Sequence, residues 1–356
     1  MRLGILGLPK AGKTTLFNTL TAAHQATDKF TASTRANVGV ARVPDARLER
    51  LGELFKPRRF VPATVTYVDV PGIKRGEGGE SLDAAELRAV DALVHVVRAF
   101  EDPEIVHPEG SIDPARDVAT VDLELILADH TQVERRLERL AKAGKRGLTA
   151  EEERERALLA EVILPALEAE RPLREVDLAP EDARRLKGFG LLSAKPMLVV
   201  LNVDEARLVE GEALARGLPV GAGVEILAAS APIEEEISRL PREEQREFLA
   251  ELGLAEPSLD RLVRASYALL GLSSFFTVGE DEVRAWTIRR GTRAREAAGT
   301  IHSDLERGFI RAEVVGWEDL VRLGSLAACR DRGILRLEGK DYEVADGEVM
   351  HVRFNV

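Results

Sequence analysis

The spacing of apolar residues divides the chain into three kinds of sequence. Up to about residue 120, short apolar runs typical of strands alternate with amphipathic segments typical of helices. Strands are expected at 3–7, 63–70 and 91–100, and helices at 13–23 and 80–90. Alternation of this kind predicts an α/β domain with a parallel sheet.

The pattern changes near residue 120. Leucines and isoleucines recur at helical spacing in two charged runs, so we expect an inserted α-helical hairpin with coiled-coil-like packing. Strand-like sequence returns at 196–201 and 224–232, and beyond residue 273 short strands and turns predict a separate, mostly β module. The expected domains are an α/β domain at 1–120 plus 196–272, the hairpin at 121–195 and the β module at 273–356.

Composition narrows the class of protein. The 356 residues are too many for one ordinary core, and 45% apolar with 31% charged residues is typical of a globular chain. No apolar run reaches the roughly 18 residues of a membrane helix, and no signal-like segment precedes the first strand, so we expect a cytoplasmic protein without a membrane partner. The net charge of −11 argues against DNA specificity. Nothing requires more than a monomer.

The stretch GLPKAGKT, residues 7–14, has the spacing G-x-x-x-x-G-K-S/T and lies between an expected strand and helix. In that context the glycines turn backbone N–H groups towards phosphate oxygens, Lys13 neutralises phosphate charge in catalysis, and the Thr14 hydroxyl ligates Mg²⁺. The motif therefore predicts a nucleotide site. Its expected contacts are Gly7, Pro9, Lys10, Ala11, Gly12, Lys13, Thr14 and Thr15.

A second element follows at Asp69, which ends an apolar strand, and Gly72, three residues later. An aspartate there can hold Mg²⁺ together with Thr14, and the glycine N–H can sense the γ-phosphate as part of a switch. Ile73 comes next, where many hydrolytic relatives place a glutamine that orients water. Isoleucine cannot hydrogen-bond a water, so we expect slow unaided hydrolysis.

The stretch LNVDE, residues 201–205, is a variant of the guanine-reading pattern N-K-x-D at a strand end. Its asparagine is present, but Val203 replaces the lysine and Glu205 the aspartate. Because glutamate is one methylene longer, guanine recognition is weakened and adenine becomes admissible. The residues expected around the base are Asn202, Val203, Glu205, Ser230, Ala231 and Pro232.

Five stretches occur in a characteristic order: the phosphate loop, YVDVPG, DALVHVVRAFEDPEIVHPEG, LNVDE and the ending GKDYEVADGEVMHVRFNV. In this combination the chain resembles the YchF subfamily of Obg-like P-loop NTPases over essentially its whole length. The resemblance implies a Ras-like P-loop NTPase domain, an inserted α-helical coiled-coil hairpin and a C-terminal β-grasp domain of the TGS type. It also implies preference for ATP over GTP, slow hydrolysis and association with ribosomes.

Some positions depart from that family or need a choice. The family usually has Asn-Val where this chain has Lys10-Ala11, and such an asparagine is linked to potassium-assisted hydrolysis. The potassium requirement is therefore open, and we hypothesise that Lys10 supplies the positive charge itself. The switch hydroxyl that closes on Mg²⁺ is assigned to Ser33, with Thr34 as the alternative. His107 is a candidate for orienting water, and anchoring its loop is its alternative role.

Two basic features stand out from the acidic background. The expected hairpin tip carries Lys142, Lys145 and Arg146, and the β module begins with Arg289, Arg290 and Arg293 near a tryptophan. Arginine pairs with phosphate and tryptophan can stack on a base, so we predict contact of both features with RNA or the ribosome. The alternatives are solvated charge at the tip and a tryptophan packed in the small core.

The combined expectation is a ribosome-associated switch ATPase that requires Mg²⁺ and binds ATP or ADP. Two alternatives remain open. One is a GTP-binding and GTP-hydrolysing switch of the same fold, in which Glu205 reads guanine. The other is a nucleotide-stabilised RNA- or ribosome-binding scaffold whose hydrolysis is incidental. A metabolic kinase is disfavoured, because the motifs come in the order of a switch protein.

Overall fold

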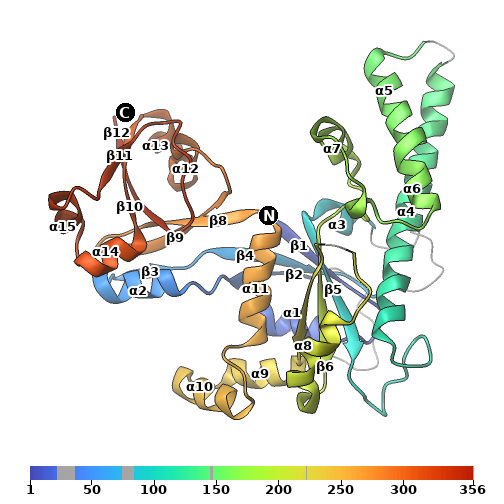
Figure 1. Ribbon diagram of the computed structural model, residues 1–356, viewed down its shortest axis with the longest axis horizontal. Coiled ribbons are helices and arrows are strands. Elements are labelled where there is room, and N and C mark those ends of the chain that lie inside the picture. Colours follow the sequence, from blue (N-terminus) through green and yellow to red (C-terminus); the bar gives the residue numbers. More distant parts are fainter. Residues whose placement is uncertain (22–36, 74–83, 145–146, 222, 356) are drawn as a thin grey trace. The chain divides into compact units, whose positions relative to one another are not determined.

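The computed structural model describes residues 1–21, 37–73, 84–144, 147–221 and 223–355 (Figure 1). Internal packing divides the chain into two units. The first comprises Met1–Val40 and Thr66–Leu262, and the second Ala41–Val65 and Val263–Val356. Both units are therefore assembled from segments that are distant in sequence.

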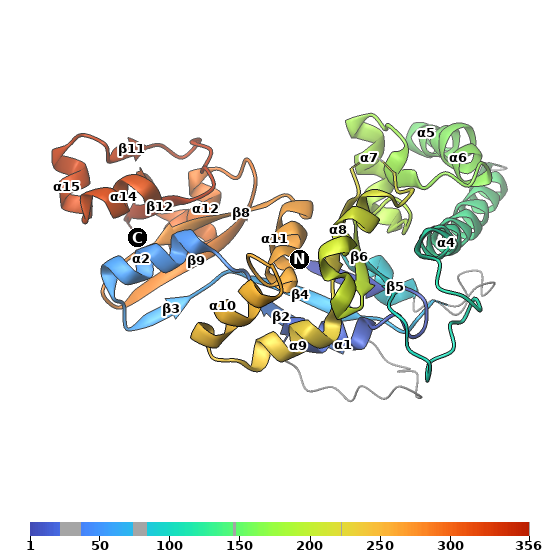
Figure 2. The same ribbon diagram turned by 60° about the horizontal axis from the view of Figure 1, so that its bottom comes forward.

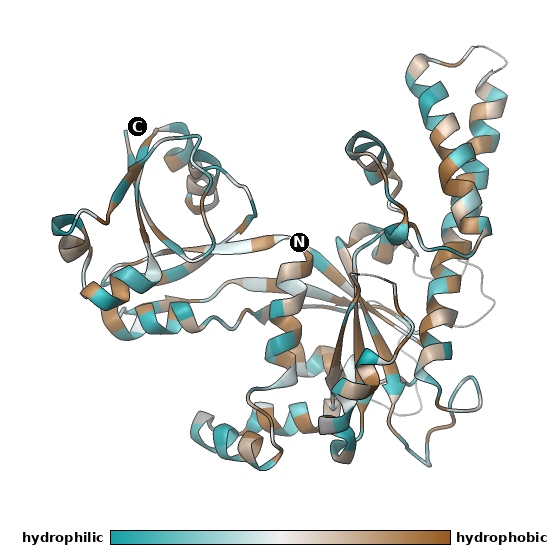
Figure 3. Cartoon of the chain, in the orientation of Figure 1, coloured by the Kyte–Doolittle hydropathy of each residue, from teal (hydrophilic) through white to brown (hydrophobic). Residues whose placement is uncertain are grey.

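The first unit is built on a six-stranded sheet in the order β2-β4-β1-β5-β6-β7. The four pairs from β4 to β7 are parallel, as the alternating pattern predicts. Strands β5 and β6 are buried along their whole length, which is why their sequences are mostly apolar on both faces. The central strands are accordingly largely brown in Figure 3. The strands are β1 (Arg2–Leu6), β2 (Asn37–Arg42), β4 (Thr64–Asp69), β5 (Ala92–Ala99), β6 (Met197–Val203) and β7 (Glu225–Ala229).

Helices cover this sheet through an apolar core. Val121 and Leu125 of α4 pack in one buried cluster with Val97 of β5 and Val199 of β6. The Ras-like nucleotide domain expected from sequence is thus confirmed. The helices that follow its strands are α1 (Lys13–Thr21), α3 (Ala84–Ala89), α8 (Leu208–Arg216), α9 (Ala231–Arg239), α10 (Arg242–Glu251) and α11 (Ser258–Leu269).

A helical hairpin with its own core extends from this domain. Its long helix α4 (Pro114–Ala143) begins at the cap Asp113, whose side chain accepts from the Arg116 N–H. Leu140 of α4 packs with Leu159 on the returning arm. That arm consists of α5 (Ala150–Leu158), a π-helical turn (Leu159–Ile163), α6 (Leu164–Glu168) and then α7 (Pro180–Leu186). Coiled-coil packing of the hairpin stays a prediction.

Over the described ranges, no helix combines the length and the apolar character needed to cross a membrane.

The second unit contains a mixed six-stranded sheet in the order β11-β10-β12-β8-β9-β3. Phe275 and Met350 of this sheet pack with Ala297 of α12 in a separate core. Its helices are α2 (Ala46–Phe55), α12 (Ala294–Ile301), α13 (Ser303–Arg307), α14 (Trp317–Leu323) and α15 (Leu326–Asp331). Its strands are β3 (Arg59–Val61), β8 (Leu272–Thr277), β9 (Glu282–Arg289), β10 (Phe309–Gly316), β11 (Arg336–Glu338) and β12 (Glu348–Phe354). The TGS assignment of this unit stays a prediction.

The segment 41–65 joins the C-terminal sheet, although its sequence position suggested the nucleotide domain. Strand β3 pairs in parallel with β9, from Arg59 opposite Glu282 to Val61 opposite Arg284 (Figure 2). The periodicity of a short strand does not reveal which sheet it will join. The predicted range 1–120 for the nucleotide domain therefore includes a segment that packs with the C-terminal unit. The division into three domains stays a prediction.

An arginine on α2 ties this segment to the C-terminal sheet. The Arg47 guanidinium donates to Asp45 Oδ1 at 2.9 Å and to Asp346 Oδ2 at 2.7 Å. It also lies 5.5 Å from the centroid of the Phe276 ring. Asp346 Oδ1 in turn accepts from the Ser274 N–H at 2.8 Å, which connects the pair to β8.

We expect Arg47→Ala to lower the free energy of unfolding by about 1–3 kcal/mol, because it removes charge-assisted hydrogen bonds to two carboxylates. Urea denaturation of the full chain measures the change. Arg50→Ala is the control, since Arg50 is exposed and pairs with Glu53 at 3.6 Å on the same helix. Equal stability of the two variants would contradict this role of Arg47.

Candidate functional site

The phosphate loop connects the end of β1 to the start of α1, and two of its residues must be glycine. Gly7 has φ +147° and Gly12 has φ +93°. A Cβ on Gly7 would lie 2.3 Å from the Val96 carbonyl oxygen, and one on Gly12 would lie 2.3 Å from Asn202 Nδ2. The loop therefore passes directly against β5 and β6, where only a bare backbone fits.

Lys13 is the buried cation of this loop. Its Nζ donates to the carbonyl oxygens of Leu8 at 2.9 Å and Gly7 at 3.2 Å. Burial lowers the pKa of Lys13 to about 8, against the opposing effect of the nearby Asp69 carboxylate. The ammonium group is therefore mostly protonated at pH 7, and phosphate oxygens can replace its carbonyl partners.

Thr14 and Asp69 meet as the sequence predicted for a metal site. Thr14 Oγ1 donates to Asp69 Oδ2 at 3.0 Å. The other carboxylate oxygen, Oδ1, is buried without a hydrogen-bond partner among the described residues. Burial raises the pKa of Asp69, while Thr14 and Lys13 oppose this shift. A hydroxyl beside an unpartnered carboxylate oxygen suits Mg²⁺, which takes its other oxygens from phosphates and water. Ser33 and Thr34 lie outside the described residues.

Gly72 and Ile73 bring the predicted switch to the phosphate loop. A Cβ on Gly72 would lie 3.0 Å from the backbone of Pro9 and 3.1 Å from Lys13 Nζ. The Ile73 N–H donates to the Gly7 carbonyl at 3.0 Å. The Ile73 side chain is buried in the apolar cluster of the domain. Isoleucine at this position is thus a core residue that fixes the start of the switch.

Asn202 connects the two sides of the site. Its Nδ2 donates to the Ala11 carbonyl at 3.0 Å, and its Oδ1 accepts from the Ala231 N–H at 3.1 Å. The predicted turn 230–232 therefore lies beside the phosphate loop, with Ser230 buried and Pro232 exposed at the start of α9.

The other residues of LNVDE are arranged differently. The Val203 side chain is buried in the apolar cluster, so only its backbone is available to a base. Glu205 is exposed and begins a 3₁₀ turn that ends at Arg207. Asp204 Oδ2 accepts from the Glu101 N–H at 3.2 Å, which ties this loop to the one after β5.

His107 is buried in the loop before α4. Its Nδ1 accepts from the Glu109 N–H at 3.2 Å, and its Nε2 lies 2.9 Å from Asp117 Oδ2 in the first turn of α4. Nδ1 is therefore hydrogen-bonded, and Nε2 lies close to the Asp117 carboxylate without forming a geometrically good hydrogen bond to it. The arrangement favours the alternative named from sequence, in which His107 anchors its loop, and its catalytic role stays a prediction.

Sequence reasoning missed Arg98 and Phe100 at the carboxyl end of β5. Arg98 is buried and donates to the carbonyls of Phe100 at 3.2 Å and Ile105 at 3.1 Å. Its guanidinium lies 4.6 Å from the centroid of the Phe100 ring, and that ring is 4.0 Å from a Cβ built on Gly12. An arginine near the end of a largely apolar run was the available signal, because a buried guanidinium must have partners.

Comparison with known proteins identifies the family. A family model described as a 50S ribosome-binding GTPase matches residues 2–142, and YchF-GTPase_C, described as a protein of unknown function, matches residues 272–355. The chain is 44% identical over 366 residues to the Ribosome-binding ATPase YchF of Bacillus subtilis, covering 99% of each chain. The chain belongs to the YchF family. It is a P-loop NTPase, as its phosphate loop indicated.

Two further relatives agree with the YchF assignment. The structure of the Schizosaccharomyces pombe YchF GTPase is 32% identical, has a TM-score of 0.84 and covers 99% of this chain and 97% of its own. The rice protein Obg-like ATPase 1 is 37% identical and covers 100% of this chain and 92% of its own. The resemblance inferred from five short motifs therefore holds over the whole length.

The basic residues of this YchF protein lie in different settings. Lys142 is exposed within 3.9 Å of Glu138, and Lys145 and Arg146 lie outside the described residues. Arg289 and Arg290 are exposed, and Arg293 pairs with Asp341 at 3.1 Å. The nearby Trp286 is partly buried and packs against the core of this unit, while its Nε1 donates to Thr277 Oγ1 and Arg284 lies over its ring. Its setting is that of a packed tryptophan.

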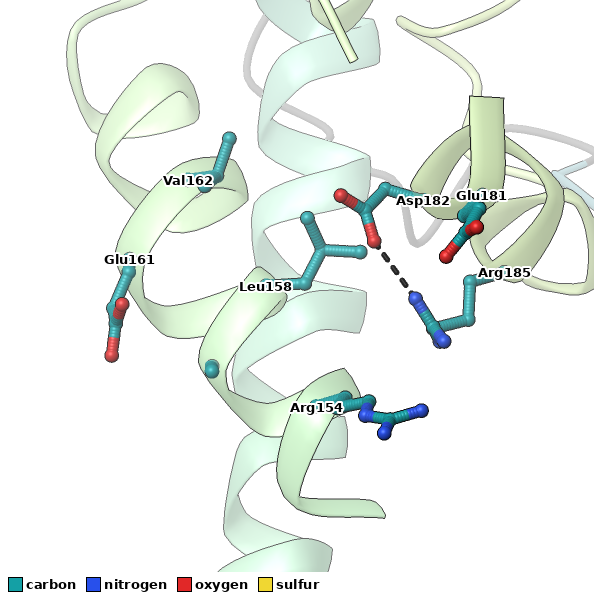
Figure 4. A pocket seen from close by; sticks show the side chains of 8 residues that line it. Arg154, Leu158, Glu161, Val162, Glu181, Asp182 and Arg185 are labelled. Carbon is teal, nitrogen blue, oxygen red and sulfur yellow. Dashed lines mark hydrogen bonds and ion pairs between the residues drawn. The ribbon is translucent and has the colours of Figure 1, made fainter. Parts of the chain in front are cut away.

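A shallow groove of about 440 Å³ lies on the helical hairpin (Figure 4). Leu158 and Val162 form its apolar part, and Arg185 bonds to Asp182 at its rim. No residue of the phosphate loop lines it, so it is separate from the nucleotide site of the YchF fold.

We expect Asn202→Ala to lower the free energy of unfolding by about 2–4 kcal/mol and to weaken nucleotide binding. The reason is that the Ala11 carbonyl and the Ala231 N–H would lose their buried partner. Urea denaturation and nucleotide titration measure the two effects. Glu205→Ala is the stability control, because that side chain is exposed and its loss should change stability by less than about 0.5 kcal/mol.

The depressed pKa of Lys13 predicts proton uptake on nucleotide binding. Phosphates stabilise the charged ammonium, so binding raises this pKa from its value of about 8. Affinity should stay flat below that pH and fall by up to about tenfold per pH unit above it. Calorimetry in two buffers of different ionisation enthalpy measures the proton uptake. Lys13→Arg, with a permanent charge, should abolish the pH dependence, and constant wild-type affinity to pH 9.5 would refute the prediction.

Proposed function

We propose that this protein is a nucleotide-switched ATPase that binds the ribosome or its RNA as a cytoplasmic monomer. The main support for this proposal comes from the residues expected around the base. Asn202 still braces the phosphate loop, whereas the guanine-reading aspartate is replaced by the exposed Glu205. The names of the relatives support the same function, since those of Bacillus subtilis and Haemophilus influenzae are ribosome-binding ATPases.

ATP is preferred over GTP because guanine needs a fixed pair of carboxylate oxygens at its edge. Glu205 stands on a short surface turn, and no partner within the described ranges holds its carboxylate. Phe100 lies near Gly12 with Arg98 over one face of its ring. We propose that its other face can contact a base of any kind without selecting guanine. The GTP-hydrolysing alternative requires Glu205 to become ordered when the nucleotide binds.

Catalysis consists mainly of phosphate positioning and charge neutralisation. Lys13 and the loop N–H groups hold the phosphates, and Thr14 and Asp69 hold Mg²⁺, which supplies further neutralisation of the phosphate charge. The switch hydroxyl is Ser33 or Thr34. Because the Ile73 side chain is apolar and buried, the position directly after Gly72 offers no hydrogen bond to a water, and we expect slow unaided turnover. His107 can position the attacking water only if its ring moves away from Asp117.

Nucleotide state would act through the residues that follow Asp69. Gly72 lies next to Lys13, with no room for a side chain between them, and the Ile73 N–H donates to the Gly7 carbonyl. We expect a γ-phosphate that enters the loop to change the surroundings of both residues. We infer that this change alters ribosome affinity. The RNA contacts proposed from sequence, Lys142, Lys145 and Arg146 at the tip and Arg289, Arg290 and Arg293 in the C-terminal unit, are the first surfaces to compare.

The test is ribosome co-sedimentation with a non-hydrolysable ATP analogue, with ADP and without nucleotide, beside a Mg²⁺-dependent hydrolysis assay. We expect slow ATP hydrolysis that is lost without Mg²⁺ and ribosome affinity that differs at least about threefold between nucleotide states. Lys13→Ala should remove both the hydrolysis and the difference. Equal ribosome affinity in all nucleotide states would contradict the switch function and favour the scaffold alternative.

Lys10 provides a separate prediction about potassium. It has φ +66°, a conformation in which asparagine is more easily accommodated than lysine, so Lys10→Asn should fold. If Lys10 supplies the cation, wild-type hydrolysis should be equal in potassium and sodium. The Lys10→Asn variant should then become potassium-stimulated. Strong potassium activation of the wild type would rule out this role.

A further inference from the structure

Strands β10, β11 and β12 form one end of the C-terminal sheet, and their two faces differ. Ala312, Val314 and Met350 point into the core that contains α12. Alternate residues of a strand point to opposite faces, so the residues between them form the other side. Val315 and Val349 on this side are buried, so only part of it is accessible. We call that part the open sheet face, and it consists of Arg311, Glu313, Leu337, His351 and Arg353, with Arg330 reaching it from α15.

Two arginines on this face are direct cross-strand neighbours. Arg311 of β10 pairs with Arg353 of β12 in the antiparallel register. Like charges in directly opposite positions destabilise a sheet, so the Arg311–Arg353 pair does not by itself stabilise the fold. Arg311 has no ion-pair or hydrogen-bond partner among the residues for which the structure gives contacts, and its side chain is exposed. The pair leaves positive charge available to a ligand.

Glu313 organises the arginines around it. It accepts from Arg330 at 3.1 Å and also from Arg353, and its own side chain is only 11% exposed. The side chains of Arg330 and Arg353 are 57% and 54% exposed, so each is held by Glu313 and still accessible to solvent. Arginines held in place in this way bind phosphate with less loss of side-chain freedom than unpaired ones.

The rest of the open sheet face suits a nucleic-acid strand. Leu337, which lies opposite Glu313 on β11, is 47% exposed, and His351 on β12 is exposed. They add an apolar contact and a ring next to the arginines. Three arginines stand against one glutamate here, in a chain with a net charge of −11. This local excess points to an anionic polymer as the occupant.

We propose that the open sheet face binds the phosphate backbone of RNA, with Arg311 and Arg353 as its central contacts. This inference rests on the proposed ribosome association and specifies a surface for it. The surface differs from the predicted contacts Arg289, Arg290 and Arg293, which lie at and just beyond the end of β9. Strand β8 separates β9 from β12 in the strand order. An acidic protein is the competing occupant and is treated as an outcome of the test.

The experiment compares Arg311→Gln/Arg353→Gln with the control Arg307→Gln/Arg322→Gln, in full-length protein. The control arginines are exposed and pair with Asp304 and Asp319 three residues earlier. Co-sedimentation with ribosomes and fluorescence anisotropy with a labelled ribosomal RNA fragment are measured at several salt concentrations, with ATP hydrolysis alongside. The test variant should bind RNA at least about tenfold more weakly, and the salt slope of its log affinity should fall by about two. The control variant and hydrolysis should be unchanged.

The other outcomes separate the two proposals. If wild-type protein binds neither ribosomes nor RNA, the proposed function fails. If the wild type binds both and Arg311→Gln/Arg353→Gln binds equally well, the open sheet face is not the RNA site and the inference is overturned. If this variant loses ribosome binding while its RNA affinity is unchanged, the face binds a ribosomal protein, which also overturns the inference.

Discussion

The close approach of the phosphate loop to its neighbouring strands is the constraint on which the nucleotide site depends. Gly7 passes against the Val96 carbonyl, and Gly12 against the Asn202 amide. Asn202 then holds Ala11 on one side and Ala231 on the other. The loop, the base-side turn and the central strands are thus fixed as one assembly. Lys13, Thr14 and Asp69 take their positions from that assembly, so their chemistry follows from backbone packing.

Local spacing was sufficient to predict much of this site. The phosphate loop has a fixed length and two obligatory glycines, and the strand before Asp69 is clear from its apolar residues. The proximity of Thr14 and Asp69, a contact of 3.0 Å, could therefore be predicted from sequence, and their role as Mg²⁺ ligands stays a prediction. Only part of the role of Ile73 could be predicted from the sequence. Its inability to orient water follows from chemistry, but its place in the apolar core follows from packing.

Contacts between distant segments explain what the sequence did not predict. Segment 41–65 contributes β3 and α2 to the C-terminal unit. Strand β3 pairs with β9, and Arg47 of α2 binds Asp346. No local sequence pattern indicates that these elements pack there. The environment of His107 likewise depends on Asp117, ten residues away on another element. Arg98 braces a loop whose carbonyls have no sequence signature. Side-chain partners of this kind are set by tertiary structure.

Titration calorimetry on nucleotide-free protein with Mg²⁺ tests the preference for adenine over guanine nucleotides most directly. ATP, ADP, GTP and GDP are compared under one set of conditions. We expect the adenine nucleotides to bind at least about tenfold more tightly, a difference of about 1.4 kcal/mol, because Glu205 is not held at the guanine edge. Equal or tighter binding of the guanine nucleotides would contradict it and make the protein a GTP switch.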